Sequence, residues 1–206
     1  MAITEKATME TTVMRSEDGA HRYLLQKVWD KDKKDALLIM LMAGHADTVA
    51  IDTTTMLVMK NLKQLDFGGV TICNLFSNLL KESDEENDRI ILTAAIKAST
   101  IIVAWGTGSV TNPEAQRRIA EILEMMKPYQ KNTFCIAAPN GKSGMHPLAP
   151  VLRDRWELVP WARPVEAAPK EKEKSPSKKD KKTVPPATPG VQSFTVDKGA
   201  GEGGAT

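Results

Sequence analysis

Hydrophobic and polar positions follow two alternating patterns between residues 21 and 161 of the chain. Short runs that are apolar throughout, or at every second position, predict strands, and longer segments with apolar residues three or four positions apart predict helices. Runs that are apolar throughout are typical of strands covered on both faces. The predicted strands are residues 21–29, 36–42, 70–76, 101–105, 133–138 and 155–161, with the first and the last expected at sheet edges.

Three helices are expected between these strands, and each has a recognisable start. An Asp, Ser or Asn side chain before a helix accepts a hydrogen bond from its first free N–H groups, and Glu three residues later or Pro at the first position strengthens the signal. The starts are Asp52, Ser83 with Glu86, and Asn112 with Pro113, and the helices run to about residues 65, 98 and 127.

The alternation of strands and helices with short connections predicts an α/β fold, a three-layer α/β/α domain with a central, mostly parallel sheet. In such a fold ligands bind outside the carboxyl ends of the strands. A functional site is therefore expected on the segments that follow the predicted strands, which are residues 43–54, 74–78, 106–112 and 139–147.

Composition and charge divide the chain into a flexible N-terminus at residues 1–20, the α/β domain at residues 21–163 and a tail at residues 164–206. The tail is rich in Lys, Pro and Gly and has little to bury, so we expect it to be disordered. It holds eight lysines and six acidic residues, out of 28 basic and 26 acidic residues in the chain. The rest of the chain is therefore neutral, which disfavours a dedicated duplex-DNA binder.

The same composition predicts a cytoplasmic protein. No apolar stretch is long enough to span a bilayer, and the N-terminal segment has no apolar signal-peptide core. The two cysteines, Cys73 and Cys135, lie inside apolar runs, which favours buried free thiols in a reducing compartment.

Three polar residues, His45, Asp47 and Asp52, lie on the segment after the strand at residues 36–42. A carboxylate in this place can orient a water molecule for attack, as general-base chemistry requires. The alternatives are structural, because Asp52 already serves as a helix cap and Asp47 can stabilise the loop.

Asn74 and Phe76 close the strand at residues 70–76. The amide of an asparagine offers donors and an acceptor that suit the edge of a nucleobase, and a phenylalanine ring can stack on it. The alternative is a turn asparagine followed by a core phenylalanine.

The third group of candidates follows the strands at residues 101–105 and 133–138. Gly106, between a strand and a helix, is placed where phosphates often bind, although a tight turn is the simpler explanation. His146, followed by Pro147, can donate a hydrogen bond to a substrate or support a departing anion. A loop histidine satisfied by backbone groups is the alternative.

No cofactor and no metal are expected. The glycines near Gly106 lack the third glycine of the dinucleotide fingerprint, and the chain has no Walker lysine motif. Two cysteines in separate strands and three scattered histidines do not have the spacing of a zinc site.

A set of short motifs, in a consistent order over about residues 21–161, resembles the bacterial family known as domain of unknown function 1643. The motifs are Arg22-Tyr23-Leu24-Leu25 with Trp29, Met40-Leu41, Ala46-Asp47, Asp52-x-Thr54, Asn74-Leu75-Phe76, Asn87-Asp88, Ala104-Trp105-Gly106 and His146-Pro147-Leu148.

That family in turn resembles the uracil-DNA glycosylase superfamily, which implies a pocket for a flipped-out base. The resemblance implies that the first motif positions the hydrolytic water, that Asn74 reads the base and that His146 supports the departing base. This sequence departs from the pattern in two places. Met42 stands where the family has the asparagine of its first motif, and Ala149 stands where the family has a tyrosine.

Three hypotheses follow for the function. The first is a DNA glycosylase that hydrolyses the N-glycosidic bond of a damaged or modified base in flipped-out or single-stranded DNA, with Asp47, Asp52 and His146 as catalytic residues. His45, Asn74, Phe76, Gly106 and Pro147 would then bind the substrate. The second is a non-catalytic base- or nucleotide-binding module with a degenerate first motif. The third is an interaction protein tethered by its tail.

Overall fold

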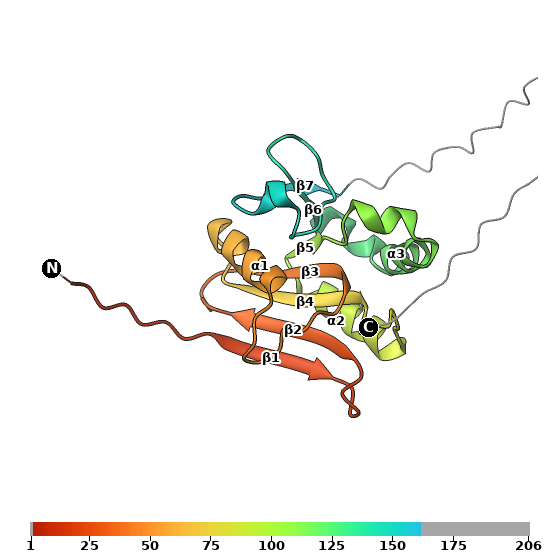
Figure 1. Cartoon of the computed structure of the whole chain (residues 1–206), viewed down its shortest axis with the longest axis horizontal. Coiled ribbons are helices and arrows are strands. Elements are labelled where there is room, and N and C mark those ends of the chain that lie inside the picture. The colour runs from red at the N-terminus through yellow and green to blue at the C-terminus, as the bar shows by residue number, and fades with distance from the viewer. Residues whose placement is uncertain (1, 162–206) are drawn as a thin grey trace, which may run out of the picture. The chain divides into compact units, whose positions relative to one another are not determined.

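The computed structural model describes residues 2–161, which form one mixed sheet with helices packed against it (Figure 1). The predicted tail lies outside the described residues. The strand order in the sheet is β1-β2-β4-β3-β5-β6-β7. The strands are β1 (Glu10–Arg15), β2 (Arg22–Val28), β3 (Asp35–Met42), β4 (Gly69–Phe76), β5 (Thr100–Val103), β6 (Thr133–Ala137) and β7 (Glu157–Pro160).

The four central strands are parallel, and the outer strands are antiparallel to their neighbours. β4, β3, β5 and β6 pair in parallel, whereas β2 pairs antiparallel with β4, β1 with β2 and β7 with β6. Parallel strands need a crossover, and each of these crossovers contains an α-helix.

Helices lie on both faces of the sheet. On one face α1 packs through Val58 and Leu62 against apolar side chains of β3, β4 and β5. On the other face α2 and α3 pack through residues such as Ile91 and Ile122. The helices are α1 (Thr53–Gln64), α2 (Glu85–Lys97) and α3 (Pro113–Met125), with short 3₁₀ helices η1 (Thr107–Thr111), η2 (Lys127–Asn132) and η3 (Pro150–Leu152).

The predicted α/β fold is confirmed, with parallel strands at its centre and helices packed on the sheet. The sheet is mixed rather than mostly parallel, because three of its six strand pairings are antiparallel. The prediction missed β1, since residues 1–20 were expected to be flexible. As a result β2, predicted at an edge, has β1 outside it.

The residues that cap the helix N-termini are those predicted from the sequence for two of the three helices. Asp52 and Asn112 cap α1 and α3, as predicted. The start of α2 is different, because Asp84 rather than Ser83 accepts the hydrogen bond from the Asn87 N–H. A carboxylate next to a hydroxyl is the stronger acceptor, and it also complements the positive end of the helix dipole.

Among residues 2–161, no helix has the length and apolar character that crossing a bilayer requires.

Candidate functional site

In open α/β sheets, ligands bind beyond the carboxyl ends of two neighbouring strands whose connections leave toward opposite faces. β3 and β5 are such a pair, and we call the expected binding place beyond their ends the crevice. The chain leaves β3 toward α1 on one face and leaves β5 toward α3 on the other, and these two strands are neighbours. A reversal of this kind separates the two connections, so that a ligand can bind between them. Side chains that reach this crevice from the β3–α1 and β5–α3 sides are therefore the first candidates.

Asp52 lies on the β3–α1 side of the crevice. Its Oδ1 accepts a hydrogen bond of 2.7 Å from the Thr55 N–H and caps α1. Its Oδ2 lies over Gly44, two residues past the end of β3, where an added Cβ would stand 2.6 Å from that oxygen. Glycine at residue 44 thus leaves room for a carboxylate oxygen directly beside the strand end.

His146 lies on the β5 side of the crevice. An added Cβ on Gly106 would stand 2.9 Å from the His146 Cβ, so the glycine after β5 leaves room for the histidine. The φ of Gly106 is +84°, a backbone conformation that residues other than glycine rarely adopt. The predicted residues Gly106 and His146 are thus brought together, with Pro147 buried beside them in the chain.

The protonation of the His146 ring follows from its surroundings. Nδ1 accepts a hydrogen bond of 3.2 Å from the Leu148 N–H, so the neutral ring carries its proton on Nε2. Burial lowers the pKa of His146 and keeps the ring neutral. In this tautomer the Nε2–H is the hydrogen-bond donor of the ring.

Asp47 lies apart from the crevice, toward β1 and β2. Its Oδ1 accepts hydrogen bonds from the Val49 and Ala50 N–H groups, at 2.8 and 2.7 Å, and these bonds lower the pKa of the carboxyl. The charges next in effect are Arg15 and Lys27 on β1 and β2. These bonds stabilise the loop, which is the structural role that the sequence analysis gave as the alternative for Asp47. His45 is exposed on the same loop.

Asn74 and Phe76 are both buried, with exposed fractions of 1% and 2%. Asn74 Oδ1 accepts a hydrogen bond of 3.2 Å from Arg22 Nη2, and its Nδ2 donates one of 2.7 Å to the Met42 carbonyl. Phe76 packs in the core on the α2–α3 face. In this conformation neither side chain is open to a ligand, so their predicted contacts with a base require a different arrangement.

Comparison with known protein families gives one match. The family model described as "Protein of unknown function (DUF1643)" matches residues 22–148. The chain belongs to this family. The matched range contains all the predicted site residues, whereas β1 and β7 lie outside it. Comparisons with curated proteins and with solved structures gave no match. No link to the uracil-DNA glycosylase superfamily is established, so that part of the resemblance stays a prediction.

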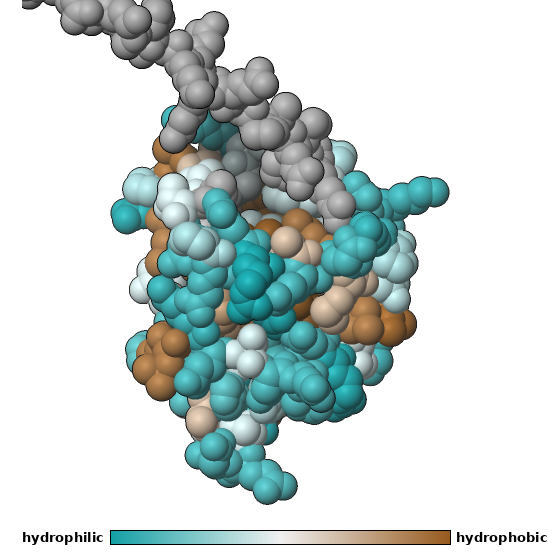
Figure 2. Space-filling model, turned by 90° about the vertical axis from the view of Figure 1, so that its right-hand side faces the viewer, coloured by the Kyte–Doolittle hydropathy of each residue, from teal (hydrophilic) through white to brown (hydrophobic). Residues whose placement is uncertain are grey.

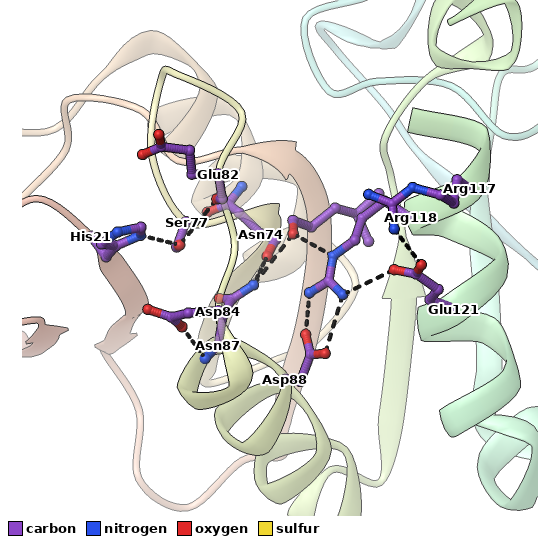
Figure 3. A network of polar contacts seen from close by, with 11 residues as sticks. His21, Asn74, Ser77, Glu82, Asp84, Asn87, Asp88, Arg117, Arg118 and Glu121 are labelled. Carbon is purple, nitrogen blue, oxygen red and sulfur yellow. Dashed lines mark hydrogen bonds and ion pairs between the residues drawn. The ribbon is translucent and has the colours of Figure 1, made fainter. Parts of the chain in front are cut away.

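The DUF1643 domain also contains a buried polar network that the sequence analysis did not select (Figure 3). Arg118 on α3 donates from Nε to the Leu75 carbonyl at 2.9 Å and forms an ion pair with Asp88 on α2. Asn87 Nδ2 donates to the carbonyls of Asn74 and Leu75, at 3.1 and 3.3 Å. These bonds tie both helices to the carboxyl end of β4.

A signal for Arg118 was present in the sequence. Arg118 shares one face of α3 with the buried residues Ala115 and Ile122. A charged residue within an apolar stripe is rarely buried without a partner, so its position indicates a specific acceptor.

A second part of the network joins β2 to the start of α2. His21 Nδ1 and Ser77 Oγ lie 2.7 Å apart, and the Tyr23 hydroxyl donates to Asp84 Oδ2 at 2.8 Å. The hydrogen bond to Asp84 is the first cause that raises the pKa of Tyr23 to about 12. Ser77 is fully buried, so this pair stabilises the loop and is not an accessible nucleophile.

The surface around the crevice combines polar and apolar parts. Figure 2 faces the right-hand side of Figure 1, toward which the parallel strands run, and shows a mainly hydrophilic surface with separate hydrophobic patches. Large apolar side chains are exposed on the loops that follow β3, β4 and β6, namely Val49, Ile51, Leu79, Leu80, Leu148 and Val151.

A cavity of about 610 Å³ lies elsewhere, between α2 and the neighbouring face of β1 and β2. None of the predicted site residues lines it. Within residues 2–161, no cluster of three or more His, Cys, Asp or Glu side chains is arranged to hold a metal ion.

Proposed function

We propose that this DUF1643 protein is a hydrolase of N-glycosidic bonds that acts on a damaged or modified base in DNA. The observation that carries the proposal is that Asp52 and His146 each pack against a glycine that follows one of the neighbouring strands β3 and β5. A carboxylate and a neutral histidine thus come from the two sides of the crevice. A carboxylate can orient a water molecule for attack, and a histidine can support a departing base.

Asp52 orients the attacking water in this proposal. Oδ1 is held by the Thr55 N–H, which fixes the carboxylate and leaves Oδ2 to accept a hydrogen bond from water. The water oxygen bonds to C1′ of the sugar while the bond between C1′ and the base nitrogen breaks. The electron pair of that bond leaves with the base, and the water proton passes to the carboxylate.

His146 supports the departing base. Its Nε2–H donates a hydrogen bond to the base as negative charge develops there, and the base then takes up a proton. A neutral histidine can fill this role, because its Nε2–H donates a hydrogen bond to developing negative charge. Donors of this kind typically contribute about 10²- to 10³-fold to a rate.

The choice of a base in DNA as the substrate rests on the resemblance to the uracil-DNA glycosylase superfamily. The exposed apolar side chains around the crevice are compatible with a flat base and its stacked neighbours. Under this proposal Asp52 takes over the water-positioning role that Met42 cannot fill. Asp47 is left out, because its carboxylate is engaged with the backbone of its own loop.

Release of bases by the purified full chain tests the proposal. Single- and double-stranded oligonucleotides carrying uracil or deaminated, alkylated or hypermodified bases are incubated with the protein, and alkaline cleavage reveals abasic sites. Asp52→Asn keeps a capping oxygen for α1, since Asn and Asp are equivalent caps, but removes the carboxylate that accepts the proton of the water. We expect this variant and His146→Ala each to release bases at least about 100-fold more slowly.

Asp47→Asn is the matched control, a second carboxylate changed on the same loop. It should keep most of the activity. Loss of activity in Asp47→Asn with full activity in Asp52→Asn would mean that the wrong carboxylate has been assigned. Full activity in both Asp52→Asn and His146→Ala would contradict the proposed mechanism.

A second candidate is a non-catalytic module that binds a base or nucleotide. The observation that favours it is Met42, an apolar residue that cannot hold a water and stands where the family has the polar residue of its first motif. Binding of these oligonucleotides with no abasic sites on any of them would support this candidate over the hydrolase.

A further inference from the structure

We propose that Arg22 and Asn74 are positioning residues that hold the Gly44–Asp52 segment in the geometry the reaction needs. This inference rests on the proposed function and assigns roles to two residues that touch neither water nor base. The buried bonds between β2, β4 and the loop after β3 carry it.

Arg22 reaches from β2 to the loop and to β4. Its exposed fraction is 5%. Nη1 donates a hydrogen bond of 2.7 Å to the Ala46 carbonyl, and Nη2 donates one of 3.2 Å to Asn74 Oδ1. One guanidinium group therefore fixes a loop carbonyl and a strand side chain at the same time, and its planar fork of donors gives the two bonds a fixed geometry.

Asn74 completes the connection from the other end of the segment. Its Nδ2 donates to the Met42 carbonyl at 2.7 Å, and the Ala43 N–H donates to the Phe76 carbonyl at 3.1 Å. The backbone is thus held at residues 42, 43 and 46. Gly44 lies between these anchored points.

Asp52 packs against Gly44, so the position of the Gly44 backbone determines where the Asp52 carboxylate lies. An added Cβ at Gly44 would stand 2.6 Å from Asp52 Oδ2, and a shift of the glycine backbone therefore displaces that oxygen or frees it to turn. Arg22 and Asp52 are also electrostatically coupled, since the charge of Asp52 opposes the lowering of the Arg22 pKa by burial.

The energetics favour positioning over simple stabilisation. Arg22 forms no ion pair among residues 2–161, and its buried Nε has no partner there. A buried charge bonded to neutral acceptors is weak evidence for a stabilising role, because desolvation offsets much of the gain. What the arrangement provides is a fixed geometry for the loop.

Arg22→Lys tests the inference, because it keeps the charge but removes the fork. Arg118→Lys is the matched control, since Arg118 is also buried and also joins a backbone carbonyl to a side-chain oxygen, but on the other face. Asn74→Asp is the second variant, which keeps the acceptor for Arg22 and loses the donor to Met42. Base release and hydrogen exchange of residues 43–55 are measured for each full-length protein.

We expect Arg22→Lys and Asn74→Asp to lower kcat about 10- to 100-fold with little change in KM, and to raise exchange in residues 43–55. Arg118→Lys should change neither. Unchanged kcat in both test variants, with an active parent protein, would overturn the positioning role alone. An equal loss of kcat in Arg118→Lys would reduce the effect to general destabilisation and also overturn it. Absence of base release by the parent protein would overturn the proposed function, and this inference with it.

Discussion

Two glycines determine where the candidate catalytic side chains lie. Gly44 and Gly106 follow neighbouring strands, and each lies against a candidate catalytic side chain, Asp52 in one case and His146 in the other. An added Cβ would meet a carboxylate oxygen at Gly44 and the Cβ of a ring-bearing residue at Gly106. Both glycines are therefore part of the site, although neither carries a reactive group.

Gly106→Ala should destabilise the domain and displace His146. The φ of +84° costs a residue with a Cβ about 1–2 kcal/mol, and the contact with His146 adds to this cost. Gly108→Ala is the control, because nothing lies within 4 Å of a Cβ there. Urea unfolding measures both variants, and equal midpoints would contradict the packing of His146 against Gly106.

His146 should titrate at a lower pH than an ordinary histidine. Burial lowers its pKa from 6.5, so the folded state binds this proton less tightly than the unfolded state does. The corresponding stability is fully present above pH 6.5 and is lost as the pH falls from there through the folded pKa. NMR titration of the ring, assigned with a His146→Ala variant, should give a midpoint below 6.5, and a midpoint at or above that value would contradict the burial.

Individual elements differ in how well the sequence predicts them. Strands β3, β4, β5 and β6 and helices α1 and α3 were predicted because continuous apolar runs and helix caps are local signals. β1 was missed because its pattern is weak, with only Thr11 and Val13 partly buried in an otherwise exposed strand. It forms through pairing with β2, a non-local interaction.

The candidate site shows the same division. Asp52, Gly106 and His146 were selected as candidates because they follow apolar runs. The positioning roles proposed for Asn74 and Arg22 could not be predicted, because they depend on which loop carbonyls lie within reach across the sheet.

The cap of α2 provides a test at the level of one element. Asp84 accepts hydrogen bonds from the Asn87 N–H and from the Tyr23 hydroxyl, at 2.8 Å in each case. Asp84→Ala should therefore cost about 1–2 kcal/mol, whereas Ser83→Ala should cost little. Thermal or urea unfolding of the two variants measures the difference. A larger loss for Ser83→Ala would restore the capping box that the sequence predicted.

At the scale of the whole molecule, the charge balance limits the electrostatic contribution to the DNA binding that the proposed function requires. Of the 28 basic and 26 acidic residues, 20 of each lie outside residues 164–206, so residues 1–163 together are neutral. The proposed action on DNA therefore does not rely on neutralising many phosphates. Under the proposed function we instead expect the DNA to be recognised at the crevice, by contacts to an exposed base.

The most direct test of the central claim is base release in water labelled with ¹⁸O. The protein is incubated with each modified oligonucleotide, and mass spectrometry follows the free base and the sugar left behind. We predict free base together with one ¹⁸O at C1′ of the abasic sugar, and a rate of base release at least about 100-fold lower for Asp52→Asn than for the parent protein. No free base from any substrate, or equal rates for the two proteins, would contradict it.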